Sequence, residues 1–167
     1  MTPFRIEQLV KQDRSYFDCG TSVLNDYLQK RAGQEQRKNF STCYLAICNQ
    51  SDTVAGFYTL SASSIALVDL PETTKRMLPR YADVPVARLG RLAVDLRFQG
   101  RGLGESLLYN AIGRVLRSGI GCYAIVVDAK DEQAISFYRH AGFDVLADTT
   151  NVLYLSVAVA DALVTSA

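Results

Sequence analysis

Apolar and polar residues recur with two different periods along the second half of the chain, and each period predicts its own kind of element. The pattern indicates, in order, a strand, a helix, a buried strand, a helix ended by Gly142, and two strands joined near 149–151, at residues 86–95, 101–118, 121–129, 131–142 and 143–159. Parallel strands joined by crossover helices bury both faces of the middle strand, and the unbroken apolar run at 125–127 fits that position. The second half is therefore predicted to follow the order β-α-β-α-β-β.

The first half is predicted to contain a strand, a helical region and a hairpin. Residues 4–9 have the pattern of an edge strand. Between residues 18 and 39, apolar residues at helical spacing follow a turn at Cys19-Gly20, which predicts one or two helices with Thr21 or Ser22 as the N-cap. Runs of β-forming residues at 43–49 and 53–68 flank a turn-like segment and predict the hairpin. A polar loop with three prolines then leads into the strand at residue 86.

Length and composition narrow the class of protein. A chain of 167 residues, 49% of them apolar, predicts a single domain over residues 1–167 with its own core. No apolar run approaches the ~20 residues that span a bilayer, and the first residues lack the apolar core of a secretion signal. We therefore expect a cytoplasmic protein without membrane contact. The four scattered cysteines and single histidine predict no disulfide framework and no metal site.

Charge is distributed unevenly along the chain, although the net charge is only +1. Residues 75–117 carry nine basic side chains against three acidic ones, whereas residues 118–167 carry six acidic side chains against two basic ones. A solvated arginine-rich surface would explain the basic cluster, but the cluster overlaps a glycine-rich turn. We therefore expect this region to bind an anion.

That turn contains glycines at positions 100, 102 and 104, between the strand at 86–95 and the following helix. Backbone amides at such a place attract phosphate, and Arg97 or Arg101 can add charge-assisted hydrogen bonds. A nucleotide triphosphatase loop would need Gly-Lys followed by Ser or Thr, and a dinucleotide fingerprint would come early in the chain. Neither fits. The glycines would also suit a tight turn that binds nothing.

The segment Gln99 to Gly104 has the Q-x-x-G-x-G form of an acyl-CoA pyrophosphate loop, and residues 136–143 match the pattern S-F-Y-x-x-x-G-F. With these motifs in this order, the chain resembles the GNAT superfamily of N-acetyltransferases. The resemblance implies an α/β (α+β) fold with a mixed, mostly antiparallel central sheet flanked by helices and a splayed parallel strand pair that holds acetyl-CoA. It assigns cofactor contacts to Leu92, Ala93, Val94, Arg97, Gln99, Gly100, Arg101, Gly102, Leu103, Gly104 and Phe137.

The same resemblance assigns the general acid to Tyr138, whose phenol would protonate the departing thiolate. The alternative is that Tyr138 is a packed aromatic residue. His140 lies two positions away and is expected on another side of the helix, near its end. The strand at 86–95 lacks the carboxylate or histidine base of many relatives, since its first carboxylate is Asp95 at the end. This absence favours an α-amine with a pKa near ~8 over a lysine side chain near ~10.4.

A narrower resemblance concerns the first half. Phe17, Cys19, Gly20, Leu24, Asn25, Tyr27 and Leu28, followed by G-x-Y-T-L-S at 56–61, are similar to the GNAT toxins of toxin-antitoxin systems. This implies acetylation of the α-amine of aminoacyl-tRNA, a block of translation, a ribbon-helix-helix antitoxin and a homodimer. A polyanion such as tRNA would dock on an arginine-rich face. The expected tRNA contacts are Arg31, Arg37, Lys38, Lys75, Arg76, Arg80, Arg88 and Arg91.

Two other functions stay open from the sequence. An acetyltransferase for a small-molecule or protein amine would have the same cofactor half, although a polyamine or aminoglycoside would favour an acidic substrate loop, and residues 71–91 are mainly basic. A non-catalytic acyl-CoA-binding module would have the same fold without turnover. Acetyl transfer to an amine is expected from the aminoacyl-tRNA acetyltransferase and from the small-molecule or protein acetyltransferase, but not from the binding module.

Overall fold

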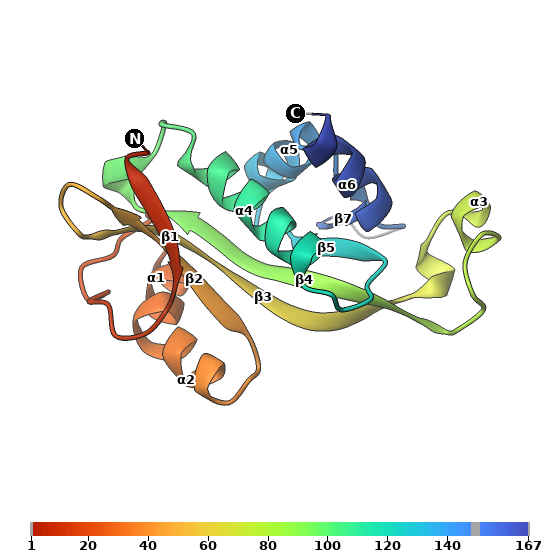
Figure 1. Cartoon of the computed structure of the whole chain (residues 1–167), viewed down its shortest axis with the longest axis horizontal. Coiled ribbons are helices and arrows are strands. Elements are labelled where there is room, and N and C mark those ends of the chain that lie inside the picture. Colours follow the sequence, from red (N-terminus) through yellow and green to blue (C-terminus); the bar gives the residue numbers. More distant parts are fainter. Residues whose placement is uncertain (1, 148–150, 167) are drawn as a thin grey trace. The chain divides into compact units, whose positions relative to one another are not determined.

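The computed structural model describes residues 2–147 and 151–166. Within them, seven strands form one sheet in the order β1-β2-β3-β4-β5-β7-β6 (Figure 1). The strands are β1 (Phe4–Gln8), β2 (Thr42–Cys48), β3 (Val54–Ala66), β4 (Asp83–Val94), β5 (Ala124–Asp128), β6 (Asp144–Val145) and β7 (Val152–Ser156). The α-helices are α1 (Ser22–Asp26), α2 (Ala32–Arg37), α3 (Glu72–Lys75), α4 (Leu103–Arg117), α5 (Glu132–His140) and α6 (Val157–Thr165). Strands β1 with β2, β2 with β3, β5 with β7 and β6 with β7 pair antiparallel, and β4 pairs with β5 in parallel, which confirms the predicted mixed, mostly antiparallel sheet.

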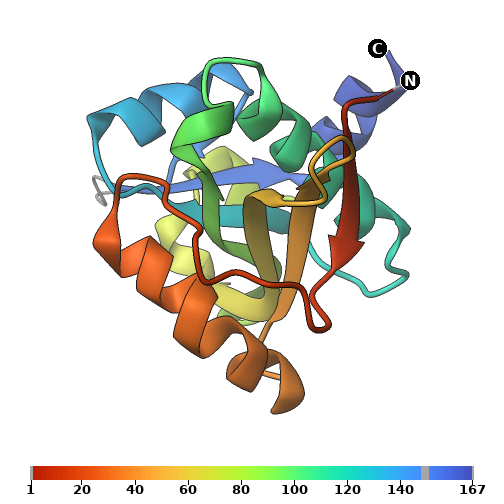
Figure 2. The ribbon, with the colours of Figure 1, turned by 90° about the vertical axis from the view of Figure 1, so that its left-hand side faces the viewer.

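The chain divides into two compact units, and strands β3 and β4 run through both. The first unit comprises Met1–Ser61 and Gly90–Ala111. In it, β1, β2 and β3 form the predicted edge strand and hairpin. A continuous helical segment runs from α1 through a π-helical turn at Tyr27–Arg31 into α2, coloured orange in Figure 2. Phe17, Tyr27 and Phe57 are buried together in the core of this unit.

The second unit comprises Ala62–Leu89 and Ile112–Ala167. Strand β5 pairs in parallel with Val86–Leu89 of β4 and antiparallel with β7, so it has a neighbour on each side. Residues 124–127 are fully buried, which confirms the prediction of a buried middle strand. Helix α5 ends as predicted, because Gly142 takes a φ of 103° directly after it.

The predicted strand running to residue 159 is wrong beyond Ser156. Strand β7 ends there, the Ser156 hydroxyl accepts a hydrogen bond from the Val159 amide at 3.2 Å, and the chain continues as α6. An apolar run of valine and alanine does not by itself distinguish a strand from a helix, and the capping serine decides for the helix. Strand β4 also begins earlier than predicted, at Asp83. The predicted junction near 149–151 falls largely on residues 148–150, outside the described residues.

The strand predicted at 53–68 ends at Ala66, because a 3₁₀ turn replaces its last two residues, and one short helix lies in the segment that was predicted only as a polar loop. The 3₁₀ turn is Leu67–Asp69, and α3 follows it. Pro71 immediately precedes α3, where its missing amide hydrogen costs no helical hydrogen bond. Among the described helices, none combines the length and the apolar character that crossing a bilayer requires.

Candidate functional site

The turn between β4 and α4 contains two glycines in the left-handed region of backbone conformation. Gly100 and Gly102 have φ angles of 77° and 78°, which side chains with a Cβ rarely adopt. No described atom lies within 4 Å of the place that a Cβ would take at either glycine, so the backbone there is open. Helix α4 begins directly afterwards at Leu103, and the first amides of a helix lack intrahelical acceptors. The turn therefore presents accessible amides beside a helix N-terminus, an arrangement that suits a phosphate group.

A buried carboxylate holds the beginning of this turn. Asp95 is 1% exposed. Its oxygens accept hydrogen bonds from the Arg97 amide at 2.9 Å, from the Arg97 guanidinium at 2.9 and 3.0 Å, and from the Asp18 amide at 3.0 Å. Burial alone raises the pKa of the Asp95 carboxyl, but the hydrogen bonds from Arg97 and Asp18 outweigh burial and hold this pKa below its usual value. Asp95 is therefore an anion at neutral pH, and its role is to fix the turn.

Hydrogen bonds connect the Cys19-Gly20 turn and Asn25, both in the first unit, to the beginning of the glycine turn. The Asn25 side chain accepts from the Cys19 amide at 2.8 Å and donates to the Asp18 carboxylate at 2.9 Å. The Asp18 carbonyl in turn accepts from the Leu96 amide at 2.8 Å. The sequence singled out Cys19 and Asn25 by resemblance but did not indicate Asp18 or this connection. Asp18 directly precedes Cys19, and this position beside the recognised motif was the only signal in the sequence that could have indicated it.

We expect the substitution Asp95→Asn to destabilise the protein by about 2–3 kcal/mol, because an amide cannot accept all the bonds that the carboxylate accepts from Arg97 and Asp18. The pKa of Asp95 is lowered by folding, so its contribution is present above the unfolded value of 3.8 and is lost as the pH falls below it. Urea unfolding of both proteins between pH 7 and pH 3 measures this. The difference between them should shrink below pH 3.8.

The matched control is Asp26→Asn, which removes an exposed carboxylate 3.5 Å from the Lys30 ammonium. An exposed ion pair of this kind contributes about 0.5 kcal/mol or less. If Asp95→Asn were no more destabilising than this control, Asp95 would not hold the turn.

The polar side chains predicted to contact the cofactor differ in the groups that they bind within the protein. Gln99 donates to the Val94 carbonyl at 2.9 Å and to the Cys19 carbonyl at 3.3 Å, so its side chain braces the turn. The Arg97 guanidinium forms an ion pair with the buried Asp95 carboxylate. Arg101 is exposed and forms no ion pair within the described part of the chain. Arg101 is therefore the better placed of the two arginines to bind an anion at the turn.

The end of β4 carries the three residues predicted to line the acyl arm. Ala93 is buried, whereas Leu92 and Val94 are half-buried. Strands β3 and β4 approach closely here, because a Cβ at Gly56 would lie 2.9 Å from the Ala93 carbonyl oxygen. Strand β4 continues to Val94, and the first residue of α4, Leu103, is buried in the same unit. Aliphatic side chains thus line the strand that leads into the glycine turn, with the small Ala93 between Leu92 and Val94.

Tyr138, the predicted general acid, lies on α5 in the second unit. Its side chain is 7% exposed and its ring makes edge contacts with Phe137 and Phe143, at centroid distances of 5.1 and 5.5 Å. Burial, and secondarily the charge of Asp128, raise the pKa of the Tyr138 phenol above its usual value of 10.0. The hydroxyl therefore keeps its proton at neutral pH. His140 is exposed at the end of the helix, where it was expected.

The basic residues predicted to contact RNA fall into two groups. Five of them are exposed: Arg31, Arg37 and Lys38 along and just after the helical segment of the first unit, and Arg76 and Arg80 after α3 in the second. The first three follow one another closely along a single segment and form its exposed cationic stretch.

The side chains of the other three predicted basic residues form ion pairs, a hydrogen bond or an aromatic contact within the protein. Lys75 pairs with Glu72 at 2.6 Å, and Arg88 binds Asp128 and the Ser63 hydroxyl. Arg91 lies over an aromatic ring at 3.6 Å. Sequence reasoning treats all eight cations alike, because the charge partner of a side chain depends on folding.

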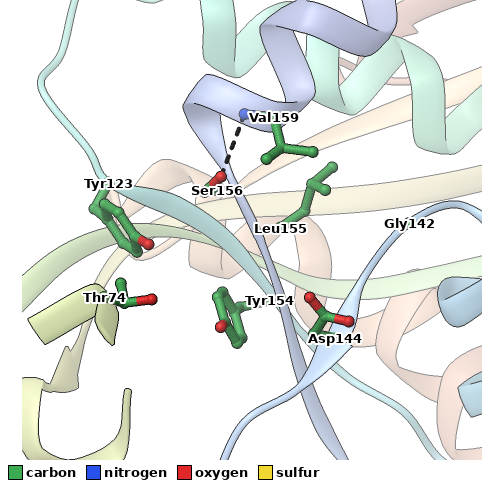
Figure 3. A pocket seen from close by; sticks show the side chains of 8 residues that line it. All are labelled: Thr74, Tyr123, Gly142, Asp144, Tyr154, Leu155, Ser156 and Val159. Carbon is green, nitrogen blue, oxygen red and sulfur yellow. Dashed lines mark hydrogen bonds between the residues drawn. The ribbon is translucent and has the colours of Figure 1, made fainter. Parts of the chain in front are cut away.

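One pocket of about 200 Å³ lies within the second unit, and Figure 3 shows its lining. Its lining includes two phenols, two hydroxyls and a carboxylate. The lining residues are Thr74, Tyr123, Gly142, Asp144, Tyr154, Leu155, Ser156 and Val159. None of them is among the predicted site residues, and the Asp144 carboxylate would repel a diphosphate. This pocket is therefore not suited to the diphosphate of the cofactor.

The profile of the Acetyltransferase (GNAT) family matches residues 7–143, which is most of the chain. The chain belongs to the GNAT acetyltransferase family. Membership confirms the predicted N-acetyltransferase activity and acetyl-CoA as the acetyl donor. The open glycine turn, the exposed Arg101 and the aliphatic side chains at the end of β4 fit that donor.

Three proteins illustrate where this GNAT chain stands within the family. A protein of Mycobacterium tuberculosis (strain ATCC 25618 / H37Rv) named tRNA-acetylating toxin is 40% identical over 152 residues, covering 90% of this chain and 88% of the relative. The structure of AtaT complexed with acetyl-methionyl-tRNAfMet has a TM-score of 0.89 and 30% identity, covering 96% and 99% of the two chains. A tyrosine-to-phenylalanine mutant of AtaT bound to the C-terminus of the antitoxin AtaR and acetyl-CoA has a TM-score of 0.83 and 27% identity, covering 98% and 99%.

Proposed function

We propose that this GNAT protein is a toxin that acetylates the α-amine of aminoacyl-tRNA and thereby blocks translation. The observation that carries the proposal is that hydrogen bonds from the protein already occupy the Asp95 carboxylate. It is the one carboxylate on the segment 86–95, and its oxygens are already occupied by Arg97 and Asp18. The segment therefore supplies no base for a lysine side chain. An α-amine with a pKa of about 8 has roughly a hundredfold larger neutral fraction at neutral pH than a lysine side chain with a pKa of about 10.4, so it depends far less on such a base.

The similar proteins support the same substrate. The mycobacterial relative is named for tRNA acetylation, and AtaT was captured with acetyl-methionyl-tRNA. The exposed cations of the helical segment in the first unit supply the positive charge that a polyanion requires. A small-molecule amine would need no such surface. The site of action would be the cytoplasm, where charged tRNA is consumed.

In the proposed division of roles, the amides of Gly100, Gly102, Leu103 and Gly104 bind the diphosphate of acetyl-CoA with help from Arg101. Gln99 and Arg97 hold the turn, and Leu92, Ala93 and Val94 offer backbone groups to the acyl arm. Bound acetyl-CoA supplies an acetyl group activated as a thioester. Tyr138 gives its proton to the departing sulfur, while Phe137 packs against the Tyr138 ring.

The partners are proposed on the same basis. Because AtaT binds the C-terminus of the antitoxin AtaR, we assign an antitoxin partner to this chain. The resemblance to the GNAT toxins implies that this antitoxin is of the ribbon-helix-helix type. We further propose that the toxin is a homodimer. Light scattering of the purified toxin, alone and with the product of the adjacent reading frame, tests both assignments.

The direct test of the function is turnover. Purified protein is mixed with acetyl-CoA and a pool of charged tRNA, and free thiol and N-acetylated aminoacyl ends are measured. Acetylated ends are expected with charged tRNA, and no thiol release with uncharged tRNA. Acetylation of spermine or peptide amines instead would favour the small-amine or protein acetyltransferase, and acetyl-CoA binding without turnover would favour a binding module.

Reversing two exposed cations should weaken RNA binding selectively. The double variant Arg37→Glu/Lys38→Glu is expected to lower the salt dependence of tRNA affinity by about 1.5 in the slope of log K against log salt, because each lost phosphate contact removes about 0.7–0.9. Acetyl-CoA affinity should stay unchanged. The measurement is fluorescence titration at several salt concentrations.

The control Lys11→Glu/Arg117→Glu makes the same change in charge at exposed cations outside the predicted tRNA contacts. It should leave the slope nearly intact. Equal effects of the two double variants would mean that only the net charge of the protein matters, and the helical segment would lose its assigned role.

A further inference from the structure

Arg91 stands apart from the other arginines of β4 and the turn that follows it. Arg88 binds Asp128, and Arg97 binds Asp95. The Arg91 guanidinium has no hydrogen-bond acceptor among the described residues, although its side chain is half-buried. A guanidinium carries five N–H donors, and a half-buried cation without an acceptor is costly. Its donors are therefore open to an anion that the protein itself does not provide.

The Tyr27 ring fixes where this guanidinium lies. The central carbon of the Arg91 guanidinium is 3.6 Å from the Tyr27 ring centroid, which is close contact for a cation over an aromatic face. Tyr27 is 3% exposed, and the Phe57 ring lies nearly parallel to it, at 18° and 6.2 Å. A ring packed in this way cannot turn aside. Contact through the face of the guanidinium leaves its edge, with the N–H groups, available for hydrogen bonds.

A partly buried hydrogen bond fixes the ring in turn. The Tyr27 hydroxyl donates to the Glu35 carboxylate at 2.6 Å, and the Ser41 hydroxyl donates to the same oxygen at 3.2 Å. Burial, and then the bond to Glu35, raise the pKa of the Tyr27 phenol to about 12, so the ring stays neutral. Hydrogen-bonded groups polarise one another, and a phenol that donates to a carboxylate has a more electron-rich ring to attract the cation.

The place of Arg91 on β4 connects it to the reaction. Side chains alternate along a strand, so Arg91 and Ala93 are directed to the same face, and Ala93 belongs to the same buried cluster as Tyr27 and Phe57. Arg91 directly precedes Leu92–Val94, the segment proposed to line the acyl arm. All of these residues belong to the first compact unit. The diphosphate of the donor is assigned to the glycine turn, on the far side of Leu92–Val94 along the chain from Arg91. The anion left for Arg91 is therefore one of the molecule that receives the acetyl group.

We propose that Arg91 binds the phosphate of the 3′-terminal nucleotide of aminoacyl-tRNA, and that Tyr27 is the positioning residue that holds the guanidinium for it. This inference rests on the proposed function. The phosphate on the 5′ side of the terminal adenosine is the anion nearest to the aminoacyl ester in such a substrate. The planar guanidinium matches a phosphate through two parallel hydrogen bonds.

The test uses two minimal substrates that differ by one group: an aminoacyl adenosine with a 5′-phosphate and the same molecule without it. The wild-type protein should favour the phosphorylated substrate by about 10- to 100-fold in kcat/KM, the effect of one charge-assisted contact. Arg91→Gln should abolish the preference by slowing only the phosphorylated substrate. Arg91→Lys keeps the charge but loses the planar contact with Tyr27, and should retain only part of the preference.

Tyr27 is tested by the same readout. Tyr27→Leu should reduce the preference to the level of Arg91→Gln, and the double variant should be no worse than either single variant. Tyr27→Phe keeps the ring and should retain most of the preference, so it serves as the rescue if Tyr27→Leu is unstable. Acetyl-CoA affinity, measured by calorimetry, should be unchanged in Arg91→Gln.

Three outcomes overturn the proposal. One is a wild-type protein that acetylates both minimal substrates equally well. Another is an Arg91→Gln variant that slows both equally or loses acetyl-CoA affinity, which would place the guanidinium on the donor. The third is a Tyr27→Phe variant that loses the preference as fully as Tyr27→Leu. If the wild type acetylates neither minimal substrate nor aminoacyl-tRNA, the proposed function itself fails.

Discussion

Replacing Tyr138 by Phe is expected to lower kcat by about 10²- to 10⁴-fold, the usual contribution of a positioned general acid. The acetyl-CoA dissociation constant should change by less than about twofold, because the buried ring and its contacts with Phe137 and Phe143 remain. Burial keeps the Tyr138 hydroxyl protonated, so in the wild type a proton is available for the thiolate throughout the neutral range. Steady-state kinetics with charged tRNA, together with calorimetry of acetyl-CoA binding, measure the two quantities.

The pH dependence follows from the direction of this shift. The active form of Tyr138 is the protonated one, and its pKa is raised above 10.0, so no loss of activity from its ionisation is expected below that pH. The rate should instead rise as the substrate amine loses its proton near pH ~8. A kcat/KM that falls between pH 8 and pH 10 would argue against Tyr138 as the acid.

Tyr123→Phe is the matched control, since Tyr123 is also a tyrosine of the second unit with a pKa raised by burial and has no assigned role in the reaction. Its rate should stay near that of the wild type. If Tyr138→Phe also retained the full rate at unchanged acetyl-CoA affinity, Tyr138 would be a packing residue only.

Replacing Gly102 by Ala is expected to weaken acetyl-CoA binding by at least about tenfold. A Cβ at this position meets no described atom of the protein, so any clash would be with a ligand drawn close to the backbone. The φ of 78° would also be strained for alanine, at a cost of about 1 kcal/mol, and relief of that strain would turn the amides away from the phosphate. Isothermal calorimetry of acetyl-CoA binding measures the loss.

Gly119→Ala separates strain from ligand binding. Gly119 has a φ of 75°, and a Cβ there likewise meets nothing within 4 Å, but it lies in the second unit, outside the glycine turn. The two variants should lose similar amounts of stability in thermal unfolding. Only Gly102→Ala should lose acetyl-CoA affinity. Equal affinities in both variants would show that the glycines of 100–104 serve the turn alone.

The sequence by itself determined the family of this protein and most of its elements, although not α3 or α6. Hydrophobic periodicity located the strands and helices because burial selects apolar residues with the period of each element. The glycines at 100 and 102 could be recognised because the left-handed turn conformation restricts the residue type locally. The S-F-Y motif at 136–138 could be recognised because it matches the pattern of the GNAT family. Fewer such signals exist near Ser156, where an apolar run is compatible with strand or helix, and there the prediction failed.

Only the tertiary structure decided which charged side chains are available. Arg88 and Arg91 lie three residues apart on one strand, yet folding pairs Arg88 with Asp128, 40 residues away, and leaves the Arg91 donors open over Tyr27. Tyr27 comes from a segment more than 60 residues away from Arg91 in the sequence. The partner of a charge depends on which distant segment packs beside it, and no local period or motif encodes that.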